Sequence, residues 1–116
     1  RIDTGLFLSI TPKSATSKII IIVDCNGVGK GGGNGYQRFV LMRDAIDLTM
    51  FNGELGYTAD SSTFSAASSS VTYSDSPNTV SSINYKVQMS NPANVGTIGI
   101  GKSSSASTIT LMEIAQ

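Results

Sequence analysis

The sequence predicts an all-β domain built as an antiparallel sandwich or barrel, and three observations support this. Apolar and polar residues alternate with a period of two in several short segments. Clusters of Gly, Pro, Asn, Asp and Ser separate these segments. No segment shows a convincing helical period. About eight short strands joined by turns pack as two sheets or as a closed barrel.

Composition limits the class of protein. At 116 residues the chain is a single domain that is large enough to bury a core. Lys plus Arg and Asp plus Glu both number 8, so nothing favours nucleic acid as a partner. The charged fraction of 14% lies below the usual value of about 25%, and Ser and Thr take that space, as in many extracellular and virion β-proteins. The absence of a run of roughly 18 apolar residues argues against membrane insertion.

The titratable residues argue against an enzyme and against a cofactor. The chain contains no His, which is the commonest general base and metal ligand. Its single cysteine, Cys25, follows a row of isoleucines and is expected to be a buried core residue.

The first residues, which include no initiator Met, resemble neither a signal peptide nor a natural start. We therefore expect a C-terminal fragment of a longer protein.

The first half of the chain contains four expected strands. Residues 6–11 alternate as a half-buried strand does, and residues 18–25 contain four consecutive isoleucines, which favours a strand buried on both faces. In residues 36–50 the positions Phe39, Met42, Ile46 and Met50 also fall near helical spacing, but the alternation favours two strands, 36–43 and 46–50, with a turn at Asp44 and Ala45.

The second half contains five expected strands. Asp75 and Pro77 mark a turn, and Pro92 lies in another. Residues 83–89 alternate most regularly, with Ile83, Tyr85, Val87 and Met89 facing inward. The five expected strands are 63–66, 70–74, 83–89, 95–100 and 107–115.

The last strand is rich in Thr and Ile and lacks Gly and Pro, which predicts a central position in its sheet. Strand geometry places its residues on two faces. One face would carry Thr108, Thr110, Met112 and Ile114, and the other Ile109, Leu111 and Glu113.

Residues 26–35 are rich in glycine and are predicted to form a long, mobile hairpin loop between two antiparallel strands. They contain the dinucleotide-binding pattern G-x-G-x-x-G, but that motif requires a helix to begin there. Gly33 and Gly35 follow and argue against a helix. A second turn is predicted at Asn52 and Gly53, which form the best two-residue turn signal in the chain.

Two kinds of side chain are candidate functional groups. Asp44, Asp47 and Glu54 form the nearest approach to a carboxylate cluster, and with Asp24 and Asp60 they contain the oxygen ligands that Ca²⁺ prefers. No calcium-loop pattern is present, so we expect solvated carboxylates.

Tyrosines near the two glycine-containing loops are better candidates, because an aromatic ring stacks on the apolar face of a sugar. Tyr73 and Tyr85 lie on strands and are expected to pack in the fold. The candidate ligand-binding residues in the loops are Lys30, Asn34, Tyr36, Asn52, Glu54, Tyr57 and Asp60.

Three stretches resemble a known family. They are S-I-T-P at 9–12 followed by S-A-T-S-K-I at 14–19, Y-S-D-S-P at 73–77, and S-T-I-T-L-M-E-I at 107–114. Together they resemble a C-terminal domain of tail-fibre and related virion proteins of marine bacteriophages, such as those of cyanobacteria and SAR11-type bacteria. None of the three is a catalytic motif. Residues 27–35 are longer and richer in glycine than the family pattern, and residues 47–60 match no part of it.

The resemblance implies a non-enzymatic, homotrimeric fibre tip on the outside of the virion. Its fold would be a jelly-roll-like sandwich similar to the C1q and TNF heads, and relatives carry a further strand before the position of Arg1. The tip would bind a glycan or a protein of the host surface and would associate with other tail proteins. The alternative is a structural virion module, a fibre cap or a capsid decoration, that trimerises without binding the host. A depolymerising enzyme is disfavoured by the missing base and the small size.

Overall fold

The computed structural model describes the backbone of residues 1–116 and the side chains of residues 1–63 and 67–116. The chain folds into eight strands and one short 3-10 turn, as the all-β prediction requires. The elements are β1 (Ile2–Ile10), β2 (Lys18–Gly31), β3 (Gln37–Arg43), β4 (Ile46–Leu55), β5 (Phe64–Asp75), β6 (Ile83–Ser90), β7 (Thr97–Gly99), η1 (Lys102–Ser104) and β8 (Thr108–Ile114).

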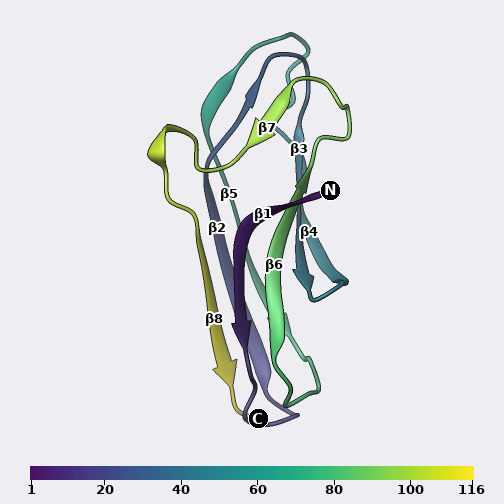
Figure 1. The fold of residues 1–116 in the computed structure, drawn as a ribbon, viewed down its shortest axis with the longest axis vertical. Coiled ribbons are helices and arrows are strands. Elements are labelled where there is room, and N and C mark those ends of the chain that lie inside the picture. The colour runs from purple at the N-terminus through teal and green to yellow at the C-terminus, as the bar shows by residue number, and fades with distance from the viewer.

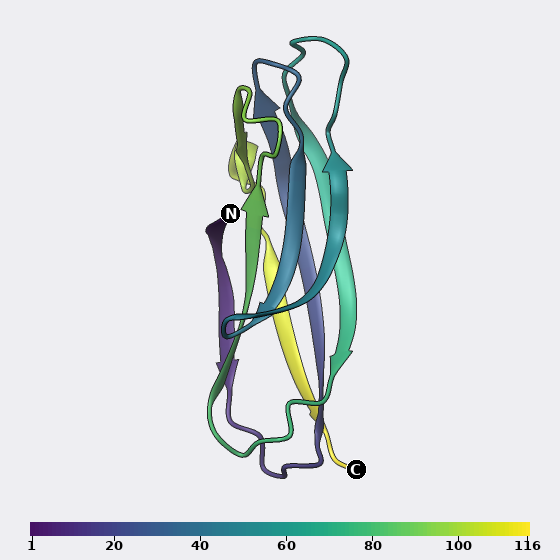
Figure 2. The ribbon, with the colours of Figure 1, turned by 90° about the vertical axis from the view of Figure 1, so that its right-hand side faces the viewer.

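The strands form two antiparallel sheets in an elongated body of 50 × 24 × 17 Å (Figures 1 and 2). Sheet A has the order β1-β6-β3-β4. Sheet B is built around the long strand β2, which pairs with β5 on one side. On its other side β2 pairs first with β8 and then, near its end, with β7.

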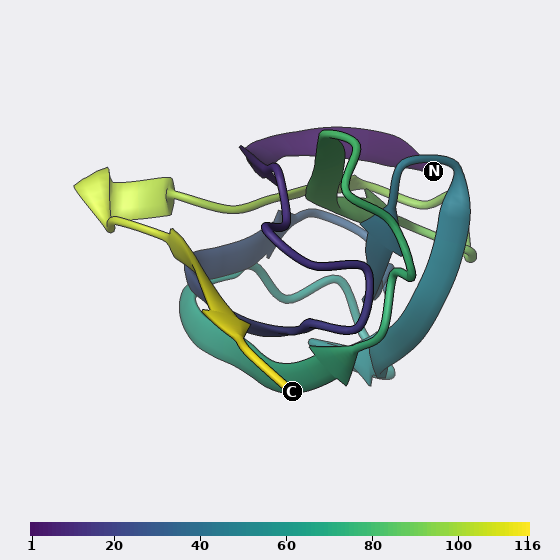
Figure 3. The ribbon, with the colours of Figure 1, turned by 90° about the horizontal axis from the view of Figure 1, so that it is seen from below.

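One hydrophobic core lies between the two sheets, and Figure 3 shows these sheets end-on. Alternate residues of β2 enter it from sheet B, and residues of β3 and β6 enter it from sheet A. The inward positions predicted for β6 are confirmed, and so is the burial of Cys25, which raises the pKa of its thiol to about 11. The hydrophobic residues of this core with no exposed area are Ile19, Ile21, Val23, Cys25, Val28, Phe39, Leu41, Tyr85 and Val87.

The prediction that residues 18–25 are buried on both faces is wrong. Ile19 and Ile21 are fully buried, whereas Ile22 on the opposite face is 37% exposed. The reason is that β2 has a neighbouring strand on each side but only one sheet packed against it. A run of β-branched residues therefore indicates a central strand here, but not a second covering layer.

The glycine-rich segment is not the predicted hairpin loop. β2 continues through Gly31, and only residues 32–36 lead to β3, which belongs to the other sheet. Gly27 has φ +62° and lies against the backbone of Lys102, where a Cβ atom would come within 2.6 Å of the amide nitrogen. The register of β2 shifts at this point. Glycine therefore allows η1 and β7 to approach β2, a role that the sequence pattern alone does not distinguish from a loop.

Two predicted breaks in the chain are absent. Asn52 and Gly53 lie inside β4, and Asn52 pairs with Phe39 rather than forming a turn. The two strands predicted at 63–66 and 70–74 are the single strand β5, which pairs along most of the length of β2. In both cases a neighbouring strand supplies a hydrogen-bonding ladder to residues of low strand propensity, β3 for β4 and β2 for β5. The predicted turn at Asp44 is confirmed, with φ +50° at that residue.

The predicted central position of the last strand is also wrong. β8 alternates as expected, with Ile109, Leu111 and Glu113 turned toward the core side. It pairs with β2 alone among the strands of the described chain, so it lies at an edge of sheet B. Its composition resembles that of a central strand, yet its second side carries no strand.

Candidate ligand-binding site

Three loops gather at one end of the molecule, beyond the ends of β2, β4 and β6 (Figure 1, top). We call this end, formed by residues 32–36, 56–63 and 91–96, the loop end. The first and third loops lie close together because Gly35 has no side chain. A Cβ atom there would collide with the carbonyl oxygen of Val95, which accepts a hydrogen bond of 2.9 Å from Nδ2 of Asn91.

Two tyrosines meet at the loop end. The rings of Tyr36 and Tyr57 contact each other edge to face, with centroids 6.0 Å apart and an interplanar angle of 78°. The guanidinium carbon of Arg38 lies 5.8 Å from the centroid of Tyr36. Tyr57 is 53% exposed, so one aromatic surface is open to solvent. Such a surface suits the apolar face of a sugar ring.

Lys30, near the end of β2, holds the loop that contains Tyr57. Its side chain is only 2% exposed, and its Nζ donates a hydrogen bond of 2.5 Å to Oγ1 of Thr58. Thr58 in turn donates to the carbonyl oxygen of Asp60 at 3.0 Å. Hydrogen bonds from the side chain and backbone of Ser62, assisted by the charge of Lys30, lower the pKa of Asp60 below its ordinary value.

The structure thus brings together four of the seven predicted site residues, Lys30, Tyr36, Tyr57 and Asp60. Asn34 is exposed in the adjacent loop, at the same end. The other two lie on β4: Glu54 is exposed, and Nδ2 of Asn52 donates to Oγ of Ser69 in the opposite sheet. Asn52 therefore joins the two sheets.

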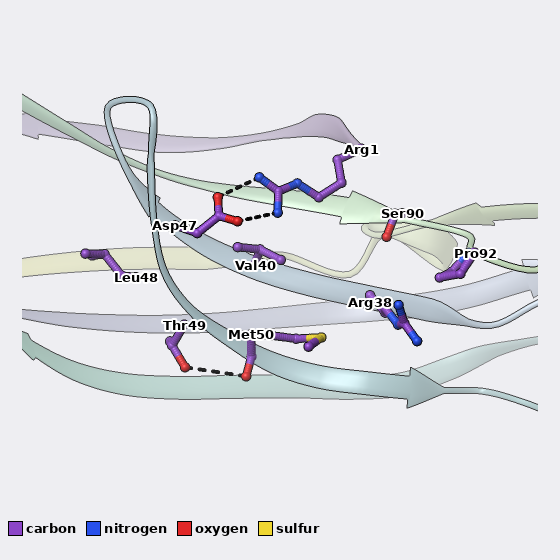
Figure 4. Close-up of a pocket in the computed structure, with 9 residues that line it drawn as sticks. All are labelled: Arg1, Arg38, Val40, Asp47, Leu48, Thr49, Met50, Ser90 and Pro92. Atoms are coloured by element: carbon purple, nitrogen blue, oxygen red, sulfur yellow. Dashed lines mark hydrogen bonds and ion pairs between the residues drawn. The ribbon is translucent and has the colours of Figure 1, made fainter.

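A groove of about 580 Å³ lies on the outer face of sheet A (Figure 4). At one end the guanidinium of Arg1 donates to both carboxylate oxygens of Asp47, at 2.6 and 2.7 Å. Arg38 lies toward the other end and connects the groove with Tyr36. The lining residues are Arg1, Arg38, Val40, Asp47, Leu48, Thr49, Met50, Ser90 and Pro92.

Sequence reasoning missed this groove. The available signal was the spacing of Tyr36, Arg38 and Val40, because alternate residues of a strand lie on one face. The alternation predicted for residues 36–43 implied this arrangement. It did not show that β4 would lie beside β3 and form the second wall.

The three carboxylates weighed as a cluster, Asp44, Asp47 and Glu54, lie apart from one another. Oδ1 of Asp44 accepts a hydrogen bond of 3.0 Å from the backbone of Asn84, Asp47 pairs with Arg1, and Glu54 is exposed elsewhere on β4. Among the described residues no group of three Cys, Asp or Glu side chains is placed to hold a metal ion. Tyr85 is fully buried and Tyr73 packs against the core, which confirms their predicted packing role.

Comparison of the chain with protein-family models, curated proteins and solved structures yields no match. The described structure also contains no helix of the length and apolar character needed to cross a membrane.

Proposed function

We propose that this protein is a receptor-binding tip domain of a phage tail fibre, located on the outside of the virion and attached to other tail proteins. In this proposal it forms a homotrimer and binds a glycan or a protein of the host surface without catalysing a reaction. The observation that carries the proposal is the meeting of Tyr36 and Tyr57 at the loop end. The resemblance of residues 9–19, 73–77 and 107–114 to tail-fibre domains supplies the biological setting.

The loop end offers both kinds of contact that a sugar needs. The exposed ring of Tyr57 provides an apolar surface, and the polar groups of Asn34 and Asp60 lie on the same end of the molecule. The hydrogen bond from Lys30 to Thr58 ties one loop to β2 and so reduces the conformational entropy lost on binding. Three copies on one fibre would multiply a weak single-site affinity.

We propose that the two sheets form a jelly roll. The strand pairs are nested: β3 with β4, β2 with β5, and β1 with β6. Successive pairs alternate between sheet A and sheet B, as they do when one long antiparallel hairpin is rolled up. Because the pair β1–β6 lies in sheet A, the next pair outward in this alternation would lie in sheet B, and β8 is found in that sheet. A strand before Arg1, as the family resemblance implies, would pair with its free edge.

The outer face of sheet B supports the proposed trimer. Ile20 and Met112 are register partners there, and Ile22 and Ile114 lie beside them. Ile22, Met112 and Ile114 are between 37% and 43% exposed. Thr and Ser side chains surround these apolar residues, with charge only from Lys18 and Asp24 on the same face of β2. An apolar patch with so little charge is typical of a surface that a partner subunit covers.

A glycan array tests receptor binding. We expect the wild-type chain to bind a set of glycans, Tyr57→Ala to lose them, and Phe7→Ala to retain them. Phe7 is a suitable control because its ring is 62% exposed on β1, away from the loop end. Equal binding by all three proteins would contradict the proposed site. The absence of any bound glycan or host protein would favour the purely structural virion module.

Sedimentation equilibrium tests the trimer. We expect a mass three times that of the 12.1 kDa chain. Met112→Lys should shift the population toward monomer, because it places a charge in the apolar patch. Val80→Lys is the control, since Val80 is 56% exposed outside the sheets. A wild-type monomer at micromolar concentration would contradict the proposal.

A further inference from the structure

Arg38 carries a charge that the described protein leaves unpaired. The ion pairs among the described residues are Arg1 with Asp47, Arg43 with Asp75, and Lys86 with Asp3, so Arg38 belongs to none of them. Its Nε donates a hydrogen bond of 3.0 Å to the carbonyl oxygen of Gly53, and its guanidinium lies over Tyr36. These two contacts orient the side chain but neutralise no charge, so its other N–H donors remain available to an anion.

The groove beside Arg38 has the size and the walls of a site for a small ligand. Its volume of about 580 Å³ falls within the range of roughly 300–1,000 Å³ that is usual for such sites. Val40 and Met50 provide an apolar surface, while Thr49 and Ser90 contribute hydroxyl groups (Figure 4). An apolar surface edged by hydroxyl groups matches a sugar ring, which has an apolar face and a polar rim.

The charges along the groove are unequal. Asp47 pairs in a bidentate manner with Arg1, whose Nε also donates to Oε1 of Gln88 at 3.1 Å. The side-chain charges of Arg1 and Asp47 therefore offset each other, whereas the charge of Arg38 has no counter-ion among the described residues. A neutral ligand would leave that guanidinium without a charged partner, whereas a carboxylate would accept two parallel hydrogen bonds from it.

We infer that the groove on the outer face of sheet A binds a carboxylate-bearing sugar of an acidic glycan, with Arg38 holding the carboxylate. The inference rests on the proposed function for the presence of a glycan, but it uses a different set of residues from the loop end. Arg38 contacts Tyr36, and Tyr36 contacts Tyr57. The groove is thus continuous with the aromatic pair, so an extended acidic chain runs from one to the other.

NMR titration of the ¹⁵N-labelled chain tests this inference. The acidic probe is a tetrasaccharide of alternating glucuronic acid and N-acetylglucosamine, and the neutral probe is the N-acetylglucosamine tetramer. We expect the acidic probe to shift the amide signals of Arg38, Val40 and Met50. The neutral probe should bind at least about tenfold more weakly, because one charge-assisted interaction is lost.

Variants of Arg38 identify the charged group. Arg38→Gln should weaken binding of the acidic probe about tenfold, and Arg38→Lys should weaken it less, because the charge remains without the bidentate geometry. Lys13→Gln removes an exposed charge from the segment between β1 and β2 and should leave the affinity unchanged. Dispersed amide spectra confirm that each variant is folded.

Equal affinity for the two probes, no shifts with either, or an unchanged affinity in Arg38→Gln would overturn the inference. Failure here is distinguishable from failure of the proposed function. If array binding is lost in Tyr57→Ala while the acidic probe leaves the groove signals unmoved, the loop-end site stands and the groove site falls. If the groove signals move while the array shows no dependence on Tyr57, the reverse holds.

Discussion

The two sheets meet along two flanks, one formed by β4 and β5 and the other by β1 and β8. The two flanks differ in the side-chain contacts that join the sheets. On the flank formed by β4 and β5, which we call the closed flank, polar side chains join the sheets. Asn52 on β4 donates to Ser69 on β5, and Arg43, at the end of the neighbouring strand β3, pairs with Asp75 at 2.7 Å. On the flank formed by β1 and β8 the strands approach each other, but no side-chain hydrogen bond joins them among those of the described residues. Leu8 pairs with the buried Tyr85 and shares its core-facing side, yet it is 42% exposed.

This difference shows which flank is held together by side-chain contacts and which is not. The β4–β5 flank uses specific polar partners, so its geometry is fixed by contacts within the chain. The β1–β8 flank exposes apolar side chains beside a free strand edge, two features that a further strand would cover together. Substitutions on the two flanks should therefore have unequal effects on the free energy of unfolding.

The largest effect is expected at Asp75 on the closed flank. It accepts hydrogen bonds from Arg43 and from the hydroxyl of Tyr85, the latter at 2.8 Å. Asp75→Ala leaves a guanidinium and a buried hydroxyl without partners, and should reduce the free energy of unfolding by about 3–5 kcal/mol. Urea denaturation measures this loss. Asp75→Asn keeps an acceptor and should lose less; a loss as large as that of Asp75→Ala would contradict this assignment.

A matched pair of leucines compares the flanks directly. Leu41 is fully buried on β3, and Leu41→Ala should reduce the free energy of unfolding by about 2–5 kcal/mol. Leu8 already contacts water, so Leu8→Ala should cost less than about 1.5 kcal/mol. Both losses are measured by urea denaturation of the two variants and the wild type under the same conditions. Equal losses would mean that the β1–β8 flank is as well covered as the core.

Asn52→Ala should have a smaller effect than Asp75→Ala or Leu41→Ala. It removes the donor to Ser69, whose side chain is 5% exposed and would lose a hydrogen-bond partner. The expected loss in the free energy of unfolding is about 1–3 kcal/mol, measured by urea denaturation. Asn84→Ala is the control, because that side chain bonds the exposed Ser9 on the other flank. A loss in Asn84→Ala equal to that of Asn52→Ala would contradict the stabilising role of the bond from Asn52 to Ser69.

The smallest effect is expected from Glu113 near the free edge. Hydrogen bonds from Ser17 and from the backbone of Lys13, the latter at 2.8 Å, lower the pKa of this carboxyl in the folded protein. Its stabilising effect is therefore complete above the ordinary pKa of about 4.3 and is lost as pH falls through the lowered value. Glu113→Gln should lose less melting temperature than wild type between about pH 6 and about pH 3. Identical losses in the two proteins would contradict this role.

Features set by neighbours in sequence were predictable. The alternation of β6, the turn at Asp44 and the burial of Cys25 follow from local pattern, and so does the all-β class. The continuation of β2 through its glycines was not predictable, because it depends on the approach of Lys102 from a distant part of the chain. Tyr36 and Tyr57 were identified from residue type and loop position, whereas the groove beside Arg38 depends on which strand lies next to β3.

The prediction of a central position for β8 was wrong for a related reason. Composition indicated a strand suited to neighbours on both sides, but it did not show whether a second neighbour exists in this chain. The alternation of β8 was correct because it depends on strand geometry alone.

Hydrogen exchange of the backbone amides of β2 and β8, followed by NMR in the 116-residue chain, tests most directly whether β8 has a free edge on the β1–β8 flank. We predict slow exchange for the β2 amides from Ile19 to Asp24, where β2 has partners on both sides. Along β8 we predict alternation, with amides directed toward β2 exchanging slowly and those directed away exchanging quickly. Uniformly slow exchange along β8, as slow as in β2, would contradict the account.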